Sequence, residues 1–498
     1  MDEINLNIKT PNETLEILGG LFESSREQKD LERLKTSIEI ANCVNLENFD
    51  SLSKANFYYF LGNAWSYIQQ IKYPDTNFEF ESEEIEKQIT YYRTSLGYLK
   101  ANNDDFIKCQ VLTNLGNLFS HIGRIVESQE YFNLCLNIDS KFGMAIGNRG
   151  FGLFHYARVI FEPIHQFIFM QYARKDLLES CKMKDVYADA KNRFDSLAKH
   201  IETAYPIEEL EDFKKYDNYY DGLAEAEIDY RTWCSVNKLF INPLNDVLTE
   251  SVVANDYLFT PSMVLKVDEK PIYQSMFNQI KQEYVSARFL FYESLISKDT
   301  HFSDKEVTLM DTLDYSVYSL SVEKAKITFK ICYSIFDKIA YFIFIYLNLG
   351  KVNRRINFKT IWFKNLDKNQ GLNETISNSN NWALRGLFWL SKDLYEKDFE
   401  VTIEPEAKEL ANIRNFIEHK SFKVVDSFNP EWTQETETYE IDRGLFEDKT
   451  FKILKLSRSA LMYLSYMIYG EENERQKNRG DGVIMPVGFI NLKDEYKT

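Results

Sequence analysis

The chain has 498 residues, of which 44% are hydrophobic and 15% aromatic, and its formal net charge is −17. This length and composition predict about three domains with filled cores and a chain that folds unaided. Because nonspecific nucleic-acid binding relies on Lys and Arg to neutralise phosphates, the acidic balance argues against a protein that coats nucleic acid. A protein that binds RNA through one local basic strip remains compatible with this net charge.

The cysteines and the terminal segments indicate the compartment. The amino terminus is acidic and lacks the basic and apolar regions of a signal peptide. The most apolar run, 339–349, is too short to span a bilayer, so we expect no membrane segment. The six cysteines lie far apart without metal-ligand spacing, which predicts free thiols in a reducing cytoplasm, no metal site and no cofactor.

The first third of the chain, residues 1–170, contains a helical repeat. Gly116 and Gly150 are 34 residues apart, the length of a tetratricopeptide unit, and Gly62 occupies the same position upstream. A glycine there lets the two helices of a unit pack closely, and Phe132 falls where the second helix needs an aromatic anchor. The region resembles tetratricopeptide repeats. We expect a concave surface for a protein partner or trigger, while a packing or dimerisation scaffold is equally compatible.

Residues 171–275 form a predicted helical connector. The segment is charged and tyrosine-rich, and the stretch 238–245 breaks its helical pattern. We find no signal of chemistry in it.

The C-terminal part, residues 276–470, predicts a helical bundle. Apolar periodicity indicates successive helices over 276–296, 322–349, 381–393, 404–420 and 452–469. The section 422–447 interrupts this pattern with alternating residues, which predicts a small hairpin beside the fourth helix. The tail, 471–498, begins with a charged stretch that we expect to be mobile.

The fourth helix carries the most informative motif of the chain, Arg414-Asn415 followed by His419. Other arginines precede histidines at similar spacing, but only Arg414 is followed by Asn. Residues four apart share a helix face, so Asn415 lies beside His419, with Asn412 next to them. Arg414 lies about 140° around the helix from His419. The two therefore converge only if the arginine bends or a second subunit completes the site. The buried stripe of this helix is predicted to be Leu410, Ile413 and Ile417.

These residue types can cut RNA without a metal. An arginine holds a phosphate, and an imidazole moves a proton near neutral pH. An equally compatible interpretation is a surface ion pair between Arg414 and Glu418, four residues apart, with His419 as a cation at the helix end.

The helices and the Arg-Asn-x-x-x-His motif resemble the HEPN superfamily over roughly the last 220 residues. The resemblance implies an all-α fold with a four-to-five-helix bundle behind a long helical amino-terminal region. It also implies a metal-independent endoribonuclease, often a toxin or phage-defence effector. Such proteins usually form a homodimer in which two motif helices face one cleft.

The resemblance further assigns roles to the motif residues. The ribose 2′-hydroxyl attacks its own phosphate and leaves a 2′,3′-cyclic phosphate and a free 5′-hydroxyl. His419 acts as general base or acid, and Arg414 holds the phosphoryl oxygens. Asn415 orients His419 or the phosphate, and a structural hydrogen bond is an equal alternative.

Two further groups of residues are candidates around this site. Asp337 and Lys338 interrupt an apolar helix and are predicted to support the site from behind, with an internal ion pair as the alternative. A basic stretch is predicted to bind RNA through Arg354, Arg355 and Lys359. Aromatic residues interleave with it and offer base stacking, although core-facing aromatics are the more common explanation. These aromatic residues are Phe358, Trp362 and Phe363.

The sequence thus predicts an all-α cytoplasmic ribonuclease that is regulated by its repeats. Two alternatives remain open. One is a non-catalytic RNA- or nucleotide-binding module, and the other is a repeat-based interaction scaffold in which Arg414 only pairs with Glu418.

Overall fold

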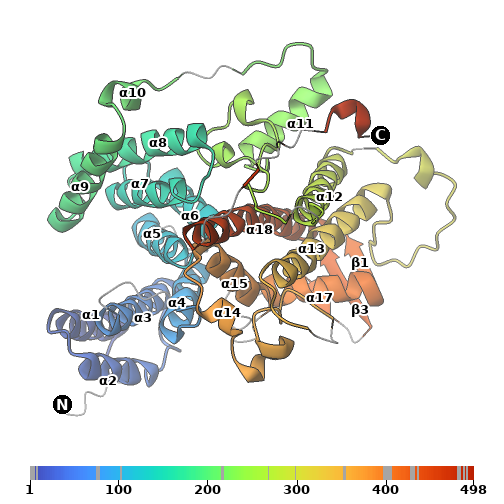
Figure 1. The fold of residues 1–498 in the computed structure, drawn as a ribbon. Coiled ribbons are helices and arrows are strands. Elements are labelled where there is room, and N and C mark those ends of the chain that lie inside the picture. Colours follow the sequence, from blue (N-terminus) through green and yellow to red (C-terminus); the bar gives the residue numbers. More distant parts are fainter. Residues whose placement is uncertain are drawn as a thin grey trace.

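The structure is a computed structural model of the chain. Helices make up most of it, and the amino-terminal helices form one arm while the C-terminal helices gather into a second body (Figure 1). The residues that it describes are 6, 9–73, 79–100, 104–214, 218–266, 269–297, 299–351, 355–395, 406–426, 432–434, 437–478, 484–485, 488 and 492–497.

The amino-terminal arm is a succession of antiparallel helices. Polar side chains fix several helix starts, because they accept hydrogen bonds from the first free backbone N–H groups. Thr10 forms a capping box with Glu13, and Asp50 caps the third helix. The helices are α1 (Pro11–Glu27), α2 (Leu31–Asn42), α3 (Ser51–Lys72), α4 (Glu83–Leu99), α5 (Asp105–His121), α6 (Ile125–Ile138), α7 (Gly143–Ala157), α8 (Pro163–Lys182) and α9 (Ala188–Ala204).

Each predicted repeat glycine lies at a close helix crossing. A Cβ on Gly62 of α3 would lie 2.5 Å from the ring of Tyr92 on α4. A Cβ on Gly116 of α5 would lie 2.5 Å from the ring of Phe132 on α6, the predicted anchor. Gly150 of α7 approaches the backbone of α8 in the same way. The three glycines therefore allow the close packing that we predicted. The boundary predicted at residue 170 falls inside α8, which pairs with α7 over its length.

The connector packs on the C-terminal body through two buried ion pairs. It contains α10 (Ile207–Glu211), α11 (Glu225–Val236) and 3-10 helices at Pro243–Asp246 and Ser251–Val253. The carboxylate of Asp246 lies 2.8 Å from the buried guanidinium of Arg458, and that of Asp256 lies 2.8 Å from the buried guanidinium of Arg288. The non-helical segment thus supplies the counter-charges for two buried arginines.

The C-terminal helices match the expected bundle. They are α12 (Ile272–Ile296), α13 (Leu320–Tyr346), the short α14 (Glu374–Ser377), α15 (Trp382–Tyr395), α17 (Glu406–His419) and α18 (Arg443–Lys477). In Figure 1, α18 runs through the middle of the molecule, between the repeat helices on one side and α12 and α13 on the other, while α15 lies next to α4 of the arm.

The last helix is much longer than the predicted 452–469. Asp442 caps its start by accepting a hydrogen bond from the N–H of Leu445. At the other end, Glu472 is buried and accepts a 2.7 Å hydrogen bond from the hydroxyl of Tyr346. The prediction of a mobile stretch from residue 471 is therefore wrong, because this charged turn packs against α13.

A small mixed sheet follows the motif helix. Its strands are β1 (Ser421–Val425), β2 (Trp432–Gln434) and β3 (Thr438–Asp442), in the order β1-β3-β2. β2 and β3 are antiparallel, as in the predicted hairpin, while β1 pairs with β3 in parallel. In the described part of the chain, no helix is long and apolar enough to cross a membrane.

Candidate functional site

The motif helix α17 is held by a buried face and a buried ion pair. Leu410, Ile413 and Phe416 are buried, whereas Ile417 of the predicted stripe is only partly buried. One turn earlier, Glu409 lies 2.9 Å from Nζ of Lys449 on α18 and accepts a hydrogen bond from Tyr439 of β3. These contacts fix the rotation of α17 and therefore the direction of its polar residues.

Arg414 bends over the bundle toward α13. Its guanidinium carbon lies 4.9 Å from the ring centroid of Tyr333, and its Nη2 atom lies 3.9 Å from Oδ2 of Asp337. Its Nε atom lies 3.3 Å from Oε2 of Glu418. Burial alone would lower the pKa of Arg414, but Glu418 and Asp337, together with Tyr395, raise it above its usual value. The arginine is therefore a fixed cation.

His419 is open to solvent and turns to the same carboxylate. Its side chain is 72% exposed, and its Nε2 atom lies 3.6 Å from Oε2 of Glu418. Arg414 and His419 thus meet at one oxygen although they start from different sides of the helix. Asn415 is exposed one turn before His419 and has no hydrogen bond to a described residue.

Asp337 joins the motif to a second arginine. Its Oδ1 atom accepts a 3.0 Å hydrogen bond from the backbone N–H of Phe358, and its Oδ2 atom lies 3.9 Å from Nη2 of Arg355. Asp337 therefore lies between Arg355 and Arg414. Lys338, the second predicted supporting residue, is paired with Glu283 of α12 instead.

The other predicted RNA contacts separate into two groups. Arg355 and Lys359 are exposed, and Arg354 lies outside the described residues. The interleaved aromatics cannot stack on bases, because Phe358, Trp362 and Phe363 are all buried in the core. Their burial confirms the core-facing interpretation, which was the more common of the two explanations.

Our sequence reasoning missed the aromatic floor of the site. Tyr333 of α13 lies beneath Arg414, and the ring of Tyr395 at the end of α15 meets that of Tyr333 at 5.8 Å in an edge-to-face contact. We had considered Glu418 only as the partner in an ion pair. The four-residue spacing between Arg414 and Glu418 was the available signal. That spacing does not predict that His419 turns to the same carboxylate oxygen.

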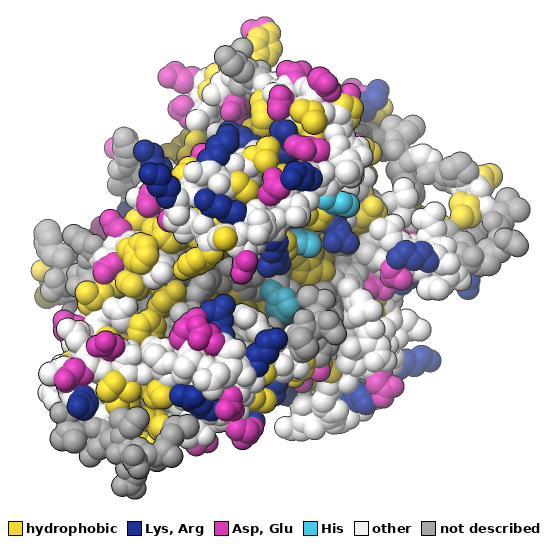
Figure 2. Space-filling view, turned by 90° about the vertical axis from the view of Figure 1, so that its left-hand side faces the viewer, with side chains coloured by type: hydrophobic (Ala, Val, Ile, Leu, Met, Phe, Trp, Pro, Cys, Tyr) yellow, Lys and Arg dark blue, Asp and Glu magenta, His cyan; other side chains and the backbone are white. Residues whose placement is uncertain are grey.

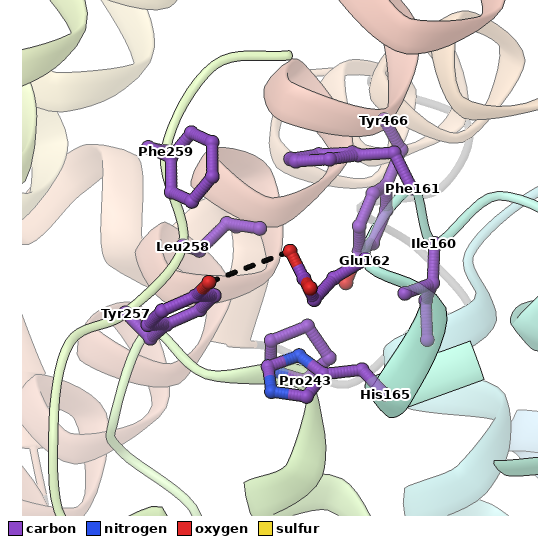
Figure 3. A pocket seen from close by; sticks show the side chains of 9 residues that line it. All are labelled: Ile160, Phe161, Glu162, His165, Pro243, Tyr257, Leu258, Phe259 and Tyr466. Atoms are coloured by element: carbon purple, nitrogen blue, oxygen red, sulfur yellow. Dashed lines mark hydrogen bonds between the residues drawn. The ribbon is translucent and has the colours of Figure 1, made fainter. Parts of the chain in front are cut away.

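A small cavity lies elsewhere, between the α7–α8 turn, the connector and α18 (Figure 3). It has room for about one water molecule. The hydroxyl of Tyr257 donates a 3.4 Å hydrogen bond to Glu162 across it, and Tyr466 forms part of its wall. None of the predicted site residues lines it. Within the described residues, no three His, Cys, Asp or Glu side chains gather as a metal site.

A helical bundle that carries an Arg-Asn-x-x-x-His motif late in its sequence is the arrangement of a HEPN domain. The model of the LA2681-like HEPN family matches residues 264–471, so this part of the chain is similar to a HEPN domain. The match contains the whole of the predicted bundle, 276–470, and begins twelve residues before it. No curated protein and no solved structure matches the chain.

Proposed function

We propose that the protein is a metal-independent endoribonuclease whose site is built from Arg414, Asn415 and His419. The observation that supports this most directly is the position of Glu418. Its Oε2 atom is 3.3 Å from the guanidinium and 3.6 Å from the imidazole, so the two groups bind one anionic oxygen together. A phosphate oxygen of RNA would occupy the same position. Arg355, which shares Asp337 with Arg414, would hold a neighbouring phosphate, and Lys359 would extend the contact.

The reaction is an internal transfer at phosphorus. The ribose 2′-oxygen forms a bond to the adjacent phosphorus and loses its proton to a base, while the bond from phosphorus to the 5′-oxygen breaks and that oxygen gains a proton. His419 serves one of these proton transfers, typically worth about 10²- to 10⁴-fold. Arg414 stabilises the charge on the phosphoryl oxygens.

A homodimer suits this chemistry. One imidazole cannot take one proton and supply the other in the same step, and α17 of one chain carries a single histidine. The partner subunit's His419, across a shared cleft, would provide the second group. We therefore propose a dimer that acts as a toxin or defence effector and is regulated through the repeats.

Cleavage-end analysis tests the proposal. The wild-type protein is expected to leave 2′,3′-cyclic phosphate ends in the presence of EDTA, and Arg414→Ala and His419→Ala should each lose cleavage. His301→Ala, a histidine in the loop after α12, is the matched control and should cleave normally. Persisting cleavage in both motif variants would remove these residues from the mechanism, and full loss with EDTA would indicate a metal catalyst.

A non-catalytic RNA-binding module is the second candidate. The pairing of Arg414 with two carboxylates favours it, because carboxylates that neutralise a guanidinium weaken its stabilisation of the charge on a reacting phosphate. RNA binding that depends on Arg414, without any cyclic phosphate ends, would select this candidate. A pure scaffold predicts that Arg414 pairs with Glu418 and that His419 is buried in the apolar core. The ion pair is present, but the side chain of His419 is 72% exposed.

A further inference from the structure

The repeat helices and α15 share a surface that the proposed cleavage does not use. The imidazole of His155 on α7 lies 4.5 Å from the ring of Phe151 and 6.1 Å from that of Trp382 at the start of α15. The indole N–H of Trp382 donates a 3.2 Å hydrogen bond to the carbonyl of His121 on α5. Figure 2 shows histidines gathered on a hollowed part of this face, with cations around them. We call the patch formed by His121, Phe151, His155 and Trp382 the histidine hollow.

The histidine hollow is flanked by two arginines that lack counter-charges. Arg158 ends α7, and Arg193 on α9 lies over the ring of Phe151 at 4.6 Å. Both are exposed, and neither forms an ion pair with a described carboxylate. Burial lowers the pKa of His155 to about 4, and both arginines act in the same direction. The hollow therefore combines neutral imidazoles and aromatic rings with two available guanidinium groups, in a chain whose net charge is −17.

We propose that the histidine hollow binds an acidic peptide segment of a partner protein. Two arginines without counter-charges fit carboxylates, since guanidinium groups bind these in bidentate fashion. The rings of Phe151, His155 and Trp382 fit apolar or aromatic side chains between them. A nucleic-acid strand carries a charge on every nucleotide and gains affinity mainly from many cation contacts, which two arginines do not supply. The repeat helices α5, α7 and α9 hold this surface, as expected of an array that binds extended segments.

The peptide would contact one end of a helix whose other end supports the candidate site. α15 runs about 20 Å from Trp382 to Tyr395. Tyr395 packs against Tyr333, and Arg414 lies over Tyr333. A peptide in the hollow would therefore contact the helix whose other end packs against the tyrosine beneath Arg414. This regulatory step rests on the proposed ribonuclease function, whereas the binding itself does not.

Fluorescence anisotropy of the full-length protein tests the binding. The probe is a fluorescein-labelled random peptide of Glu and Tyr, and a peptide of Lys and Tyr is the reference. We expect the acidic probe to bind and the Arg158→Glu, Arg193→Glu double variant to bind it about tenfold more weakly. The control is the double variant Lys141→Glu, Lys184→Glu, which makes the same charge change at exposed positions before α7 and α9. All changes are on the surface, so thermal melting should show intact folding in each variant.

The outcomes separate the alternatives. Equal affinity of both double variants, or no binding of the acidic probe, overturns the proposal. Binding of single-stranded poly(U) that depends on Arg158 and Arg193 and displaces the probe would make the hollow a nucleic-acid site and also overturn it. Anisotropy measures peptide binding without any cleavage. If the acidic probe does not bind while RNA is still cleaved, only the peptide-binding proposal is contradicted. Intact binding with no cleavage contradicts the ribonuclease alone.

Discussion

In the proposed ribonuclease, Glu418 occupies the position that a phosphate oxygen needs. Its carboxylate is held between Arg414 and His419 and is about one-third exposed, so RNA must displace it before either group can act. An ion pair of this kind on a helix surface is worth up to about 1 kcal/mol. The cost of displacing it is therefore small but measurable.

We predict that Glu418→Gln strengthens RNA binding. The amide keeps the shape but removes the negative charge, so KM for a short RNA should fall by about two- to fivefold, with kcat little changed. Glu447→Gln is the matched control, because Glu447 forms the same four-residue pair with Arg443 on α18, outside the site. Steady-state cleavage kinetics give both values. A fall in kcat for Glu418→Gln would instead assign Glu418 to the catalyst.

At the residue scale, the sequence predicted the candidate trio but not the surroundings. The order Arg414, Asn415, His419 is visible in the chain, and helical spacing places Asn415 beside His419. The contact of Arg414 with Tyr333 and Asp337 depends on how α17 packs on α13, which spacing along one helix does not determine. Base stacking stayed an alternative for Phe358 and Trp362 for a related reason. Alternating cations and aromatics occur both on stacking surfaces and at the edge of a core, and the structure places both rings in the core.

At the scale of elements, the repeats and the bundle meet at two glycines. Gly123, with φ of +86°, forms the turn between α5 and α6, and a Cβ there would lie 2.0 Å from the carbonyl oxygen of Trp382. A Cβ on Gly386 of α15 would lie 2.3 Å from the carbonyl oxygen of Gly123. The backbones of the turn and of α15 therefore touch directly. Arg93 of α4 adds a nearby ion pair to Asp393 of α15 at 2.5 Å.

Gly386→Ala is expected to destabilise the protein, since the new methyl group meets backbone that cannot rotate away. We expect a loss of about 1–3 kcal/mol in the free energy of unfolding, the usual range for an overpacked core. Gly97→Ala on α4 is the control, because nothing lies within 4 Å of its Cβ, and it should be neutral or stabilising by about 0.5–1 kcal/mol. Urea unfolding measures both. A neutral Gly386→Ala would show that α15 and the turn can separate freely.

The last helix shows why element boundaries were harder to predict than the elements. Apolar periodicity identified its middle, but the charged residues after Tyr469 resemble a solvated tail. Glu472 stays helical because it pairs with Arg475 on its own helix and with Tyr346, which is far away in sequence. Such a long-range contact leaves no trace in local periodicity.

At the scale of the whole molecule, two partly buried histidines make stability depend on pH. Burial, with help from nearby arginines, lowers the pKa of His121 and of His155 from 6.5 to about 4. In the unfolded chain they take up protons below about pH 6.5. The unfolded state therefore binds more protons between pH 6.5 and 4, and stability falls as the pH is lowered through this window.

We expect the urea midpoint at pH 5 to be lower than at pH 7, and the His121→Gln, His155→Gln double variant to lose part of that difference. The same substitution at the exposed His200 serves as the control. Urea titrations at both pH values measure the effect. An unchanged pH difference in the double variant would show that other groups, such as carboxylates, carry the whole dependence.

Composition and the repeat period predicted both helical parts of the molecule but not that they are fused. Arg93 and Asp393 are 300 residues apart, and no periodic pattern connects them. The same is true of Asp246 and Arg458. The matched HEPN region begins at residue 264, so the carboxylates of Asp246 and Asp256 lie outside it.

A fragment that begins at residue 264 is therefore expected not to fold. It would keep Arg288 and Arg458, which are buried, without the carboxylates of Asp256 and Asp246. Leaving one buried charge unpaired typically costs about 3–5 kcal/mol, which for two arginines approaches the whole stability of a domain. Circular dichroism melting should show no cooperative transition.

Variants of the full-length chain distinguish the effect of the unpaired buried arginines from the effect of losing the repeats. Asp256→Asn removes the counter-charge of Arg288 and should lower the free energy of unfolding by several kcal/mol. Adding Arg288→Met to it should restore much of the loss, since the buried charge is then gone as well. Lack of any rescue would mean that Asp256 does not act mainly by neutralising the buried charge of Arg288.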